Sequence, residues 1–128
     1  MKILGIGVDV IKNKRIQKSI KNKVFLKRIF TNLEIKSSDK FLNRSNYFAK
    51  RFAAKEAFVK TIGSGFRNNI NFNDIEILND NLGRPYYVIS KKVNIMIKKK
   101  FKIKRYNLFL SISDEKDYSV AFTILQTN

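Results

Sequence analysis

The stretch Arg51-Phe-Ala-Ala-Lys-Glu-Ala-Phe-Val-Lys-Thr-Ile-Gly-Ser-Gly65 decides the fold of this chain. At 100° per residue it predicts a helix over residues 40–62 that is apolar, and therefore buried, on most sides. The glycines that follow are typical of a helix C-cap. One acid, Glu56, falls on an apolar arc between Phe52 and Ala49. A buried carboxylate needs a cation, a metal or a cluster of donors, and Lys60, four residues on, is the simplest partner.

A second unusual carboxylate lies near the N-terminus. Residues 3–11 alternate as a β-strand does, which places Gly5, Gly7 and Asp9 on one face. Glycines within a strand often mark the close approach of another backbone or of a ligand. Asp9 either caps the following helix or joins Glu56 in a Mg²⁺ site, because Mg²⁺ usually takes one or two carboxylates plus waters and substrate phosphates. Structural ion pairs are the alternative for both acids.

Periodicity and turn residues predict the other elements. We expect a basic helical segment over 12–30, broken near Lys21-Asn22, a short helix behind a capping box at Thr31 and Glu34, and a helix over 91–100. Strands are expected over 74–79, 84–89, 107–113 and 118–125. The last two form a hairpin with a core-facing side, and Tyr118, Val120, Phe122 and Ile124 share one of its faces. The pattern predicts one α+β domain over residues 1–128, with antiparallel strands packed on the long helix.

Composition narrows the possible chemistry. The 128 residues include no cysteine and no histidine, which excludes disulfides, thiolate chemistry and imidazole bases. No apolar run approaches the ~18 residues of a membrane span and the N-terminus does not resemble a signal peptide, so we predict a soluble cytoplasmic protein that does not bind a membrane. The net charge of +17 indicates either an anionic partner or the lysine-rich composition that an AT-rich genome gives.

Four segments then occur in an order that resembles a known family. They are Gly5-Ile-Gly-Val-Asp9, the stretch quoted above, Gly83-Arg-Pro85 and Ser111-Ile-Ser113. Nearly the whole chain resembles the 4′-phosphopantetheinyl transferases, in particular the small bacterial holo-[acyl-carrier-protein] synthase branch. The first two segments are highly specific, and the last two support them.

The resemblance implies an activity and an assembly. Such an enzyme transfers 4′-phosphopantetheine from coenzyme A to a serine of apo acyl carrier protein, depends on Mg²⁺ and supports fatty acid biosynthesis. The family is typically a homotrimer with a site at each subunit interface. Nucleic acid is not among the expected partners.

The resemblance also implies roles for particular residues. Asp9 and Glu56 would bind Mg²⁺ and, with Lys60, take part in catalysis. Residues expected at the coenzyme are Arg51, Lys60, Gly63, Ser64, Gly65 and Pro85. Arg15, Lys18 and Lys21 would attract and dock the acidic carrier protein.

Two departures from the family pattern stand beside these expectations. Asp114 occupies the place of a usual histidine, where an acid would repel phosphate, and Val10-Ile-Lys-Asn-Lys14 lacks the usual acidic residue. A degenerate transferase kept as a structural partner is therefore one alternative. Another is a basic nucleic-acid-binding module, which would need exposed aromatic residues between the basic ones, whereas most phenylalanines here follow core periodicity.

Overall fold

The structure is a computed structural model that describes residues 1–63 and 70–128. Its elements in chain order are β1 (Lys2–Lys12), α1 (Asn13–Ser19), α2 (Lys23–Ile29), α3 (Asn32–Ser37), the 3₁₀ turn η1 (Ser38–Lys40), α4 (Arg44–Ile62), the 3₁₀ turn η2 (Phe72–Asp74), β2 (Ile75–Asn79), β3 (Pro85–Ile89), α5 (Lys91–Phe101), β4 (Asn107–Asp114) and β5 (Tyr118–Thr127). The predicted strands and helices are all present, with shifts of a few residues at their ends.

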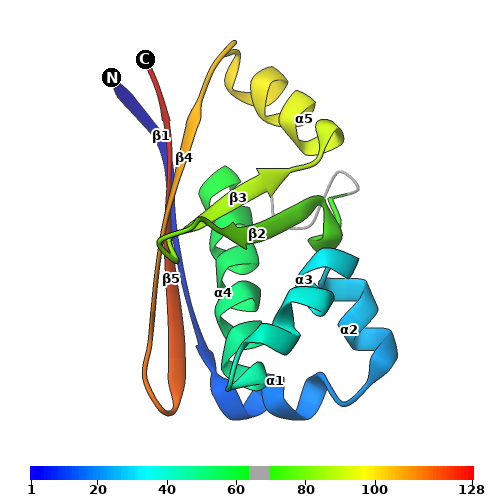
Figure 1. The fold of residues 1–128 in the computed structure, drawn as a ribbon. Coiled ribbons are helices and arrows are strands. Elements are labelled where there is room, and N and C mark those ends of the chain that lie inside the picture. The colour runs from blue at the N-terminus through cyan, green and yellow to red at the C-terminus, as the bar shows by residue number, and fades with distance from the viewer. Residues whose placement is uncertain (64–69) are drawn as a thin grey trace.

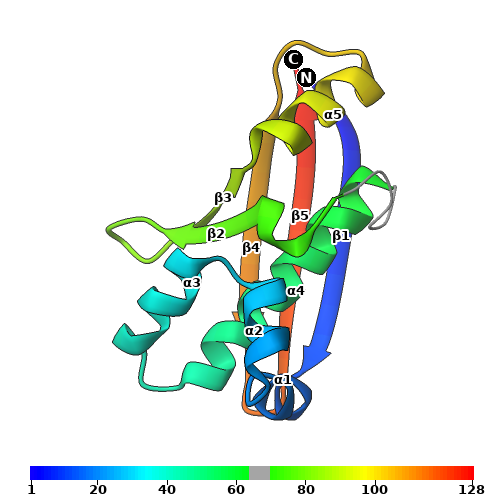
Figure 2. The same ribbon diagram turned by 90° about the vertical axis from the view of Figure 1, so that its right-hand side faces the viewer.

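Two antiparallel sheets pack around α4. One has the strand order β1-β5-β4 and the other is the β2–β3 hairpin. Figure 1 shows α4 running along one face of the three-stranded sheet, with α1, α2 and α3 beyond it and α5 at the opposite end. In the view turned by 90°, β2 and β3 cross the long strands, and the two chain ends lie side by side (Figure 2). The predicted α+β arrangement around a central helix is confirmed.

The central helix is shorter than the sequence predicts. It begins at Arg44, because the Asn43 side chain caps it by accepting a hydrogen bond from the Asn46 amide, and residues 38–40 form the separate turn η1. It ends at Gly63, whose φ of 81° is left-handed, so the predicted glycine C-cap is confirmed. Most of its side chains are buried, as predicted. The predicted break in the basic helical segment is also present, and Asn22 caps α2 there.

Backbone contact between β1 and α4 explains the N-terminal glycines. A Cβ atom at Gly5 would overlap the carbonyl oxygen of Thr61, and one at Gly7 would overlap the carbonyl oxygen of Ala57. Both obstacles are main-chain atoms of α4, which a rotamer change cannot move aside. The expected close approach of another backbone is therefore confirmed, and it sets the distance between strand and helix.

We expect Gly7→Ala to reduce the free energy of unfolding by about 2 kcal/mol or more, because the added methyl forces β1 away from α4. Urea unfolding followed by circular dichroism would measure this, since the chain has no tryptophan. Gly83→Ala is the matched control: Gly83 has a φ of 84° but no atom within 4 Å of an added Cβ, so only the conformational cost of about 1 kcal/mol applies. A Gly7→Ala protein no less stable than the Gly83→Ala protein would contradict the packing argument.

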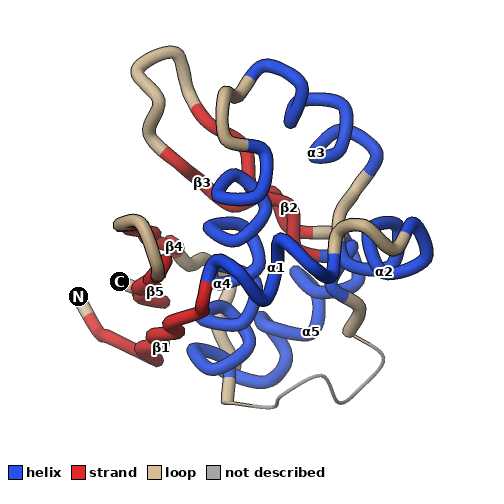
Figure 3. Tube along the Cα trace, turned by 90° about the horizontal axis from the view of Figure 1, so that it is seen from below, coloured by secondary structure: helices blue, strands red, loops and turns tan. Residues whose placement is uncertain are grey.

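Strands β1 and β5 of the three-stranded sheet carry many large apolar residues on the outer face, whereas Leu108, Leu110 and Ile112 of β4 face the core. The buried positions of β5 are Ser119, Ala121, Thr123, Leu125 and Gln126, whereas Tyr118 and Phe122 are exposed. The face shared by Tyr118, Val120, Phe122 and Ile124 is thus not the core-facing side of the hairpin, because the close approach of α4 leaves room mainly for smaller side chains. Exposed Ile6, Val8, Val10 and Phe109 continue the outer face. Seen along the strands, all the described helices lie on the other side of this sheet (Figure 3).

Candidate active site

The two unusual carboxylates come together between β1 and α4. Asp9 lies on the inner face of β1, opposite Ala121 of β5, and Glu56 is half-buried on α4. Burial raises the pKa of Glu56 and the charge of Asp9 raises it further, while Lys60 and Arg15 lower it. The two acids are therefore near enough to repel each other, and both basic groups act on the same place.

Lys60 contacts the strand rather than the acid one turn before it. Its Nζ donates to Oδ1 of Asp9 at 3.1 Å and to the carbonyl oxygen of Val8 at 3.0 Å. The simple Lys60–Glu56 ion pair is thus not the arrangement found. Asp9 does not cap α1 either, since that helix starts after Lys12 with no side-chain cap. Asp9, Glu56 and Lys60 thus lie together in one constellation between β1 and α4.

The constellation fits a magnesium ion that arrives with phosphate. No group of three or more acidic, histidine or cysteine side chains able to hold a metal occurs among residues 1–63 and 70–128. Two carboxylates suffice for Mg²⁺ when waters and substrate phosphates supply the other ligands. Lys60 holds a positive charge against Asp9, so the negative charge of the two acids is partly balanced before any metal binds.

A lysine side chain of α5 lies close to the C-terminal end of α4. Lys100 of α5 donates from Nζ to the carbonyl oxygen of Ile62 at 2.5 Å, and the same Nζ would be 3.8 Å from a Cβ at Gly63. Ser64 and Gly65, expected at the coenzyme, lie outside the described residues. Lys100 was not among the residues predicted to lie at the coenzyme. The sequence signal for it is its position in the basic run 98–104.

Arg51 is not brought to the carboxylates. It is buried, its guanidinium lies 3.6 Å from the centre of the Tyr47 ring, and it donates to Oδ1 of Asn79 next to the β2–β3 turn. Burial lowers its pKa. Its buried Nε has no hydrogen-bond partner in the described part of the chain. Because residues 51 and 56 are about 140° apart on the helix, Arg51 and Glu56 point in different directions.

Pro85 also lies away from Asp9. It lines a cavity of about 370 Å³ with Arg84 and Tyr86, at the edge of the outer sheet face near Phe109 and Phe122. A larger cavity of about 940 Å³ lies between β3, α5 and the end of β5, but it contains none of the predicted site residues. We therefore assign the site from the carboxylates rather than from cavity size.

The three residues expected to dock the carrier protein lie on and just after α1. Arg15 and Lys18 are exposed on the helix, and Arg15 is the one that also acts on the pKa of Glu56. Lys21 follows the helix and borders a cavity of about 500 Å³ that includes Leu42 and Arg44. This basic surface adjoins the carboxylate pair.

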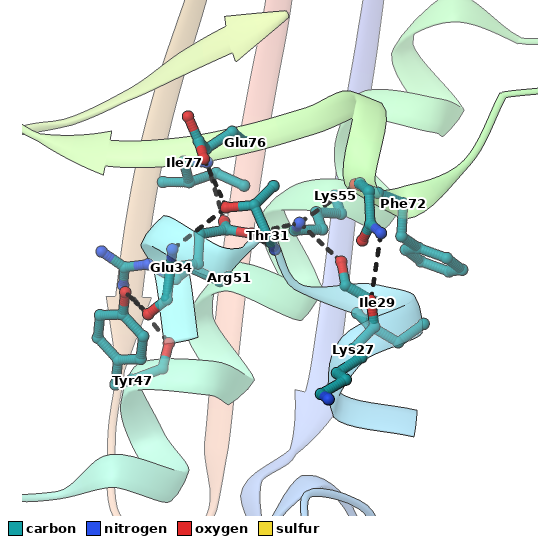
Figure 4. A network of polar contacts seen from close by, with 11 residues as sticks. Lys27, Ile29, Thr31, Glu34, Tyr47, Arg51, Lys55, Phe72, Glu76 and Ile77 are labelled. Carbon is teal, nitrogen blue, oxygen red and sulfur yellow. Dashed lines mark hydrogen bonds and ion pairs between the residues drawn. The ribbon is translucent and has the colours of Figure 1, made fainter. Parts of the chain in front are cut away.

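A buried ion pair beside the site was not predicted. Lys55 and Glu34 are both 0% exposed and are 2.7 Å apart, and Lys55 also donates to the carbonyl oxygens of Ile29 and Phe72. Figure 4 shows how these bonds connect α4 to α2, α3 and η2. Burial lowers the pKa of Lys55, and the charge of Glu34 opposes this shift. The sequence carried a signal for the burial of Lys55, because on a helical wheel Lys55 falls close beside Phe48 and Val59.

The predicted capping box at the start of α3 belongs to the same network. Thr31 N donates to Oε1 of Glu34 at 2.9 Å, and the Glu34 amide donates to the Thr31 hydroxyl at 3.2 Å. The other oxygen of Glu34 accepts from the Ile77 amide of β2 at 3.0 Å. The cap is thus also the point at which α3 is attached to the β2–β3 hairpin.

The two segments that depart from the family pattern contact each other in the structure. Buried Asn13 donates from Nδ2 to the carbonyl oxygens of Glu115 and Lys116 at 2.9 and 3.1 Å, and accepts from the Ser119 hydroxyl at 2.7 Å. It therefore holds the turn that follows Asp114. Asp114 itself is exposed and accepts a long 3.4 Å hydrogen bond from Asn46 at the start of α4.

The chain is similar to known proteins in both sequence and fold. The chain is 57% identical over 126 residues to a holo-[acyl-carrier-protein] synthase of Pelagibacter ubique, covering 98% of both chains. It resembles the crystal structure of holo-[acyl-carrier-protein] synthase from Neisseria meningitidis with a TM-score of 0.87 and 37% identity, covering 98% of this chain and 100% of that one. The Bacillus anthracis synthase, solved in complex with CoA (3′,5′-ADP), gives a TM-score of 0.80 and 33% identity over 98% of each chain.

The family assignment from the sequence is thereby confirmed. The sequence model of the 4′-phosphopantetheinyl transferase superfamily matches residues 5–123, which include both carboxylates, Lys60 and the turn after Asp114. No helix among the described residues is long and apolar enough to cross a bilayer. The chain belongs to the 4′-phosphopantetheinyl transferase superfamily.

Proposed function

We propose that this protein is a holo-[acyl-carrier-protein] synthase, which transfers 4′-phosphopantetheine from coenzyme A to a serine of apo acyl carrier protein. The observation that carries the proposal is the constellation of Asp9, Glu56 and Lys60 between β1 and α4. Relatives with this name match the chain from end to end, and one of them was solved with CoA. Family membership favours this function over a nucleic-acid-binding module.

Each residue of the constellation has a chemical task. Asp9 and Glu56 would hold Mg²⁺, which neutralises a pyrophosphate and stabilises the leaving phosphate. Lys60 carries the charge that a coenzyme phosphate needs, on a flexible and half-exposed side chain. The attacking serine must lose its proton, and with no histidine in the chain a water held by the carboxylates is the acceptor.

The coenzyme site extends over two copies of the chain in this proposal. Arg51 and Pro85 lie at the β2–β3 turn, away from Asp9, so they serve a coenzyme bound at a neighbour's carboxylates. The outer sheet face supports such an assembly, because exposed Val8 and Phe122 lie side by side on it in paired strands. An apolar face of this kind is typical of a protein interface. We propose the homotrimer on these grounds.

The acyl carrier protein docks on α1 in the same proposal. Arg15, Lys18 and Lys21 give this surface the charge that an acidic partner requires, and Arg15 lies near enough to Glu56 to bring the partner's serine to the site. We keep fatty acid biosynthesis as the process served and the cytoplasm as the location, both from the sequence analysis.

Mass spectrometry of the carrier protein tests the function directly. Apo acyl carrier protein, coenzyme A and Mg²⁺ are mixed with the protein, and the carrier is expected to gain one phosphopantetheine group. Omission of Mg²⁺ with a chelator present should abolish the gain. A carrier that stays unmodified under conditions in which an established synthase modifies it would favour the degenerate transferase instead.

We expect Asp114→His to tighten coenzyme A binding several-fold, because an exposed carboxylate near a phosphate costs up to about 1 kcal/mol relative to a neutral or cationic side chain. Isothermal titration calorimetry would measure the affinity. Asp114→Asn separates loss of charge from gain of an imidazole, and Asp117→His places the same side chain elsewhere on the same turn. An unchanged affinity in Asp114→His would show that Asp114 does not face the coenzyme.

A further inference from the structure

The position of Lys60 has a consequence for the order of binding. Its ammonium group lies on Asp9 Oδ1 and on the Val8 carbonyl oxygen, at 3.1 and 3.0 Å. It is thus held by two oxygens of β1, one of them from a predicted metal ligand. Lys60 occupies, in the protein alone, a place at which a divalent cation would need to approach Asp9.

The neighbouring acid has no such contact. Glu56 makes no ion pair within 4.0 Å in the described part of the chain, and burial, together with the nearby charge of Asp9, raises its pKa. A metal shared by the two carboxylates would relieve their repulsion, but the Lys60 ammonium on Asp9 would repel the metal. The site therefore contains its own competitor for the cation.

The Lys60 side chain can leave Asp9 at a low cost in free energy. The Lys60 side chain is 55% exposed and its Asp9 partner 15% exposed, so the ion pair is a partly solvated one of modest strength. The lysine stem is long and flexible. A pyrophosphate placed beside α4 offers the ammonium group more negative charge than Asp9 does, and would draw it away from the strand.

We propose that Lys60 acts as a latch on Asp9, so that metal binding is weak until coenzyme A withdraws the lysine, and metal and coenzyme bind cooperatively. This inference rests on the proposed function. The latch goes beyond a charge that contacts phosphate, because it assigns Lys60 a role before any phosphate is present. Since coupling between two ligands is reciprocal, the metal must also tighten coenzyme binding by the same factor.

The test measures metal binding with no carrier protein and therefore no turnover. Mn²⁺ is titrated into the protein alone by calorimetry, for the wild type, Lys60→Met and Lys60→Gln. Both variants are expected to bind Mn²⁺ about fivefold more tightly than the wild type, the size of one partly exposed ion pair. Lys50→Met is the matched control, because Lys50 lies on the same helix and the hydrogen bonds and ion pair from α4 to Val8 and Asp9 in the described part of the chain come from Lys60; its affinity should stay within about twofold of the wild type.

The same titration is repeated with saturating coenzyme A. The wild type should gain more affinity for Mn²⁺ from the coenzyme than Lys60→Met does, since only the wild type has a latch to release. The latch is overturned if the wild type and Lys60→Met bind Mn²⁺ with equal affinity in the absence of coenzyme. It is also overturned if Lys50→Met tightens Mn²⁺ binding as much as Lys60→Met does, or if no variant binds Mn²⁺. A wild type that modifies the carrier protein while failing this test leaves the proposed function standing, whereas loss of carrier modification rejects the function itself.

Discussion

Glu56→Gln is expected to lower the rate of phosphopantetheine transfer by roughly a hundredfold to a thousandfold. The amide removes one of the two charged ligands that we propose for Mg²⁺, and metal stabilisation of a transferring phosphate contributes several kcal/mol. The side chain keeps its size on α4, so packing around it is preserved. The loss should appear mainly in kcat, because the proposed carrier-docking surface on α1 is unchanged.

The same substitution is expected to leave the fold equally stable or more stable at neutral pH. Burial and Asp9 raise the pKa of Glu56, so the native state holds its proton more tightly than the unfolded chain, whose Glu pKa is 4.5. The contribution of Glu56 to stability is present at low pH and is lost as the pH rises from 4.5 through the raised native pKa. Glu56→Gln removes this loss, which is typical of a residue kept for function rather than for folding.

Two measurements check this prediction. Steady-state transfer rates give the kinetic effect, and urea unfolding between pH 4 and pH 8 gives the stability of both proteins. The wild type should lose stability relative to Glu56→Gln as the pH rises. Glu115→Gln, on the exposed turn after β4, is the control and should change neither quantity. A Glu56→Gln enzyme with wild-type kcat would remove Glu56 from the metal site.

Phe122→Glu is expected to dissociate the assembly and to abolish transfer at the same time. Phe122 is 43% exposed in the isolated chain, at the centre of the outer face and paired with Val8 of β1. A carboxylate enclosed in an apolar interface costs several kcal/mol, so association should weaken by about a thousandfold or more. Transfer should fail because, in the proposed intersubunit site, the Arg51 and Pro85 side of one copy then no longer completes the site of another.

Analytical ultracentrifugation and the transfer assay together check this second prediction. The wild type should sediment at three times the 15.0 kDa mass of one chain, and Phe122→Glu at the mass of a single chain. Ile95→Glu is the control, since Ile95 is 54% exposed on α5, away from the sheet, and should leave both mass and activity unchanged. A wild type that is monomeric and active would refute the intersubunit site.

The carboxylate constellation could be predicted from the sequence because its signals are local. Gly5, Gly7 and Asp9 break the pattern of an ordinary strand, and Glu56 breaks the pattern of an apolar helix. The capping box at Thr31 and the C-cap at Gly63 follow from side-chain and backbone preferences that need no tertiary information. The residue patterns alone leave a shared Mg²⁺ site and structural ion pairs open for the two acids, and the resemblance to the family favours the shared site.

The parts that were missed depend on contacts between distant segments. The pairing of Lys55 with Glu34 joins residues 21 positions apart, and neither residue shows its partner in the sequence. The face of the three-stranded sheet that meets the core could not be predicted from the sequence either. Alternation identifies two faces but not which one meets α4. On β1 and β5 most of the larger residues face outward, because the glycines of β1 bring α4 so close that the inner face of these two strands holds mainly smaller ones.

The glycine contacts also determine how the protein can tolerate sequence drift. Gly5 and Gly7 face the carbonyl oxygens of Thr61 and Ala57, so main-chain atoms fix the distance between the strand of Asp9 and the helix of Glu56. Apolar side chains elsewhere in the core can be exchanged at nearly constant volume at little cost. A lineage whose nucleotide composition favours isoleucine and phenylalanine codons can thus exchange apolar side chains elsewhere in the core while the two carboxylates keep their separation.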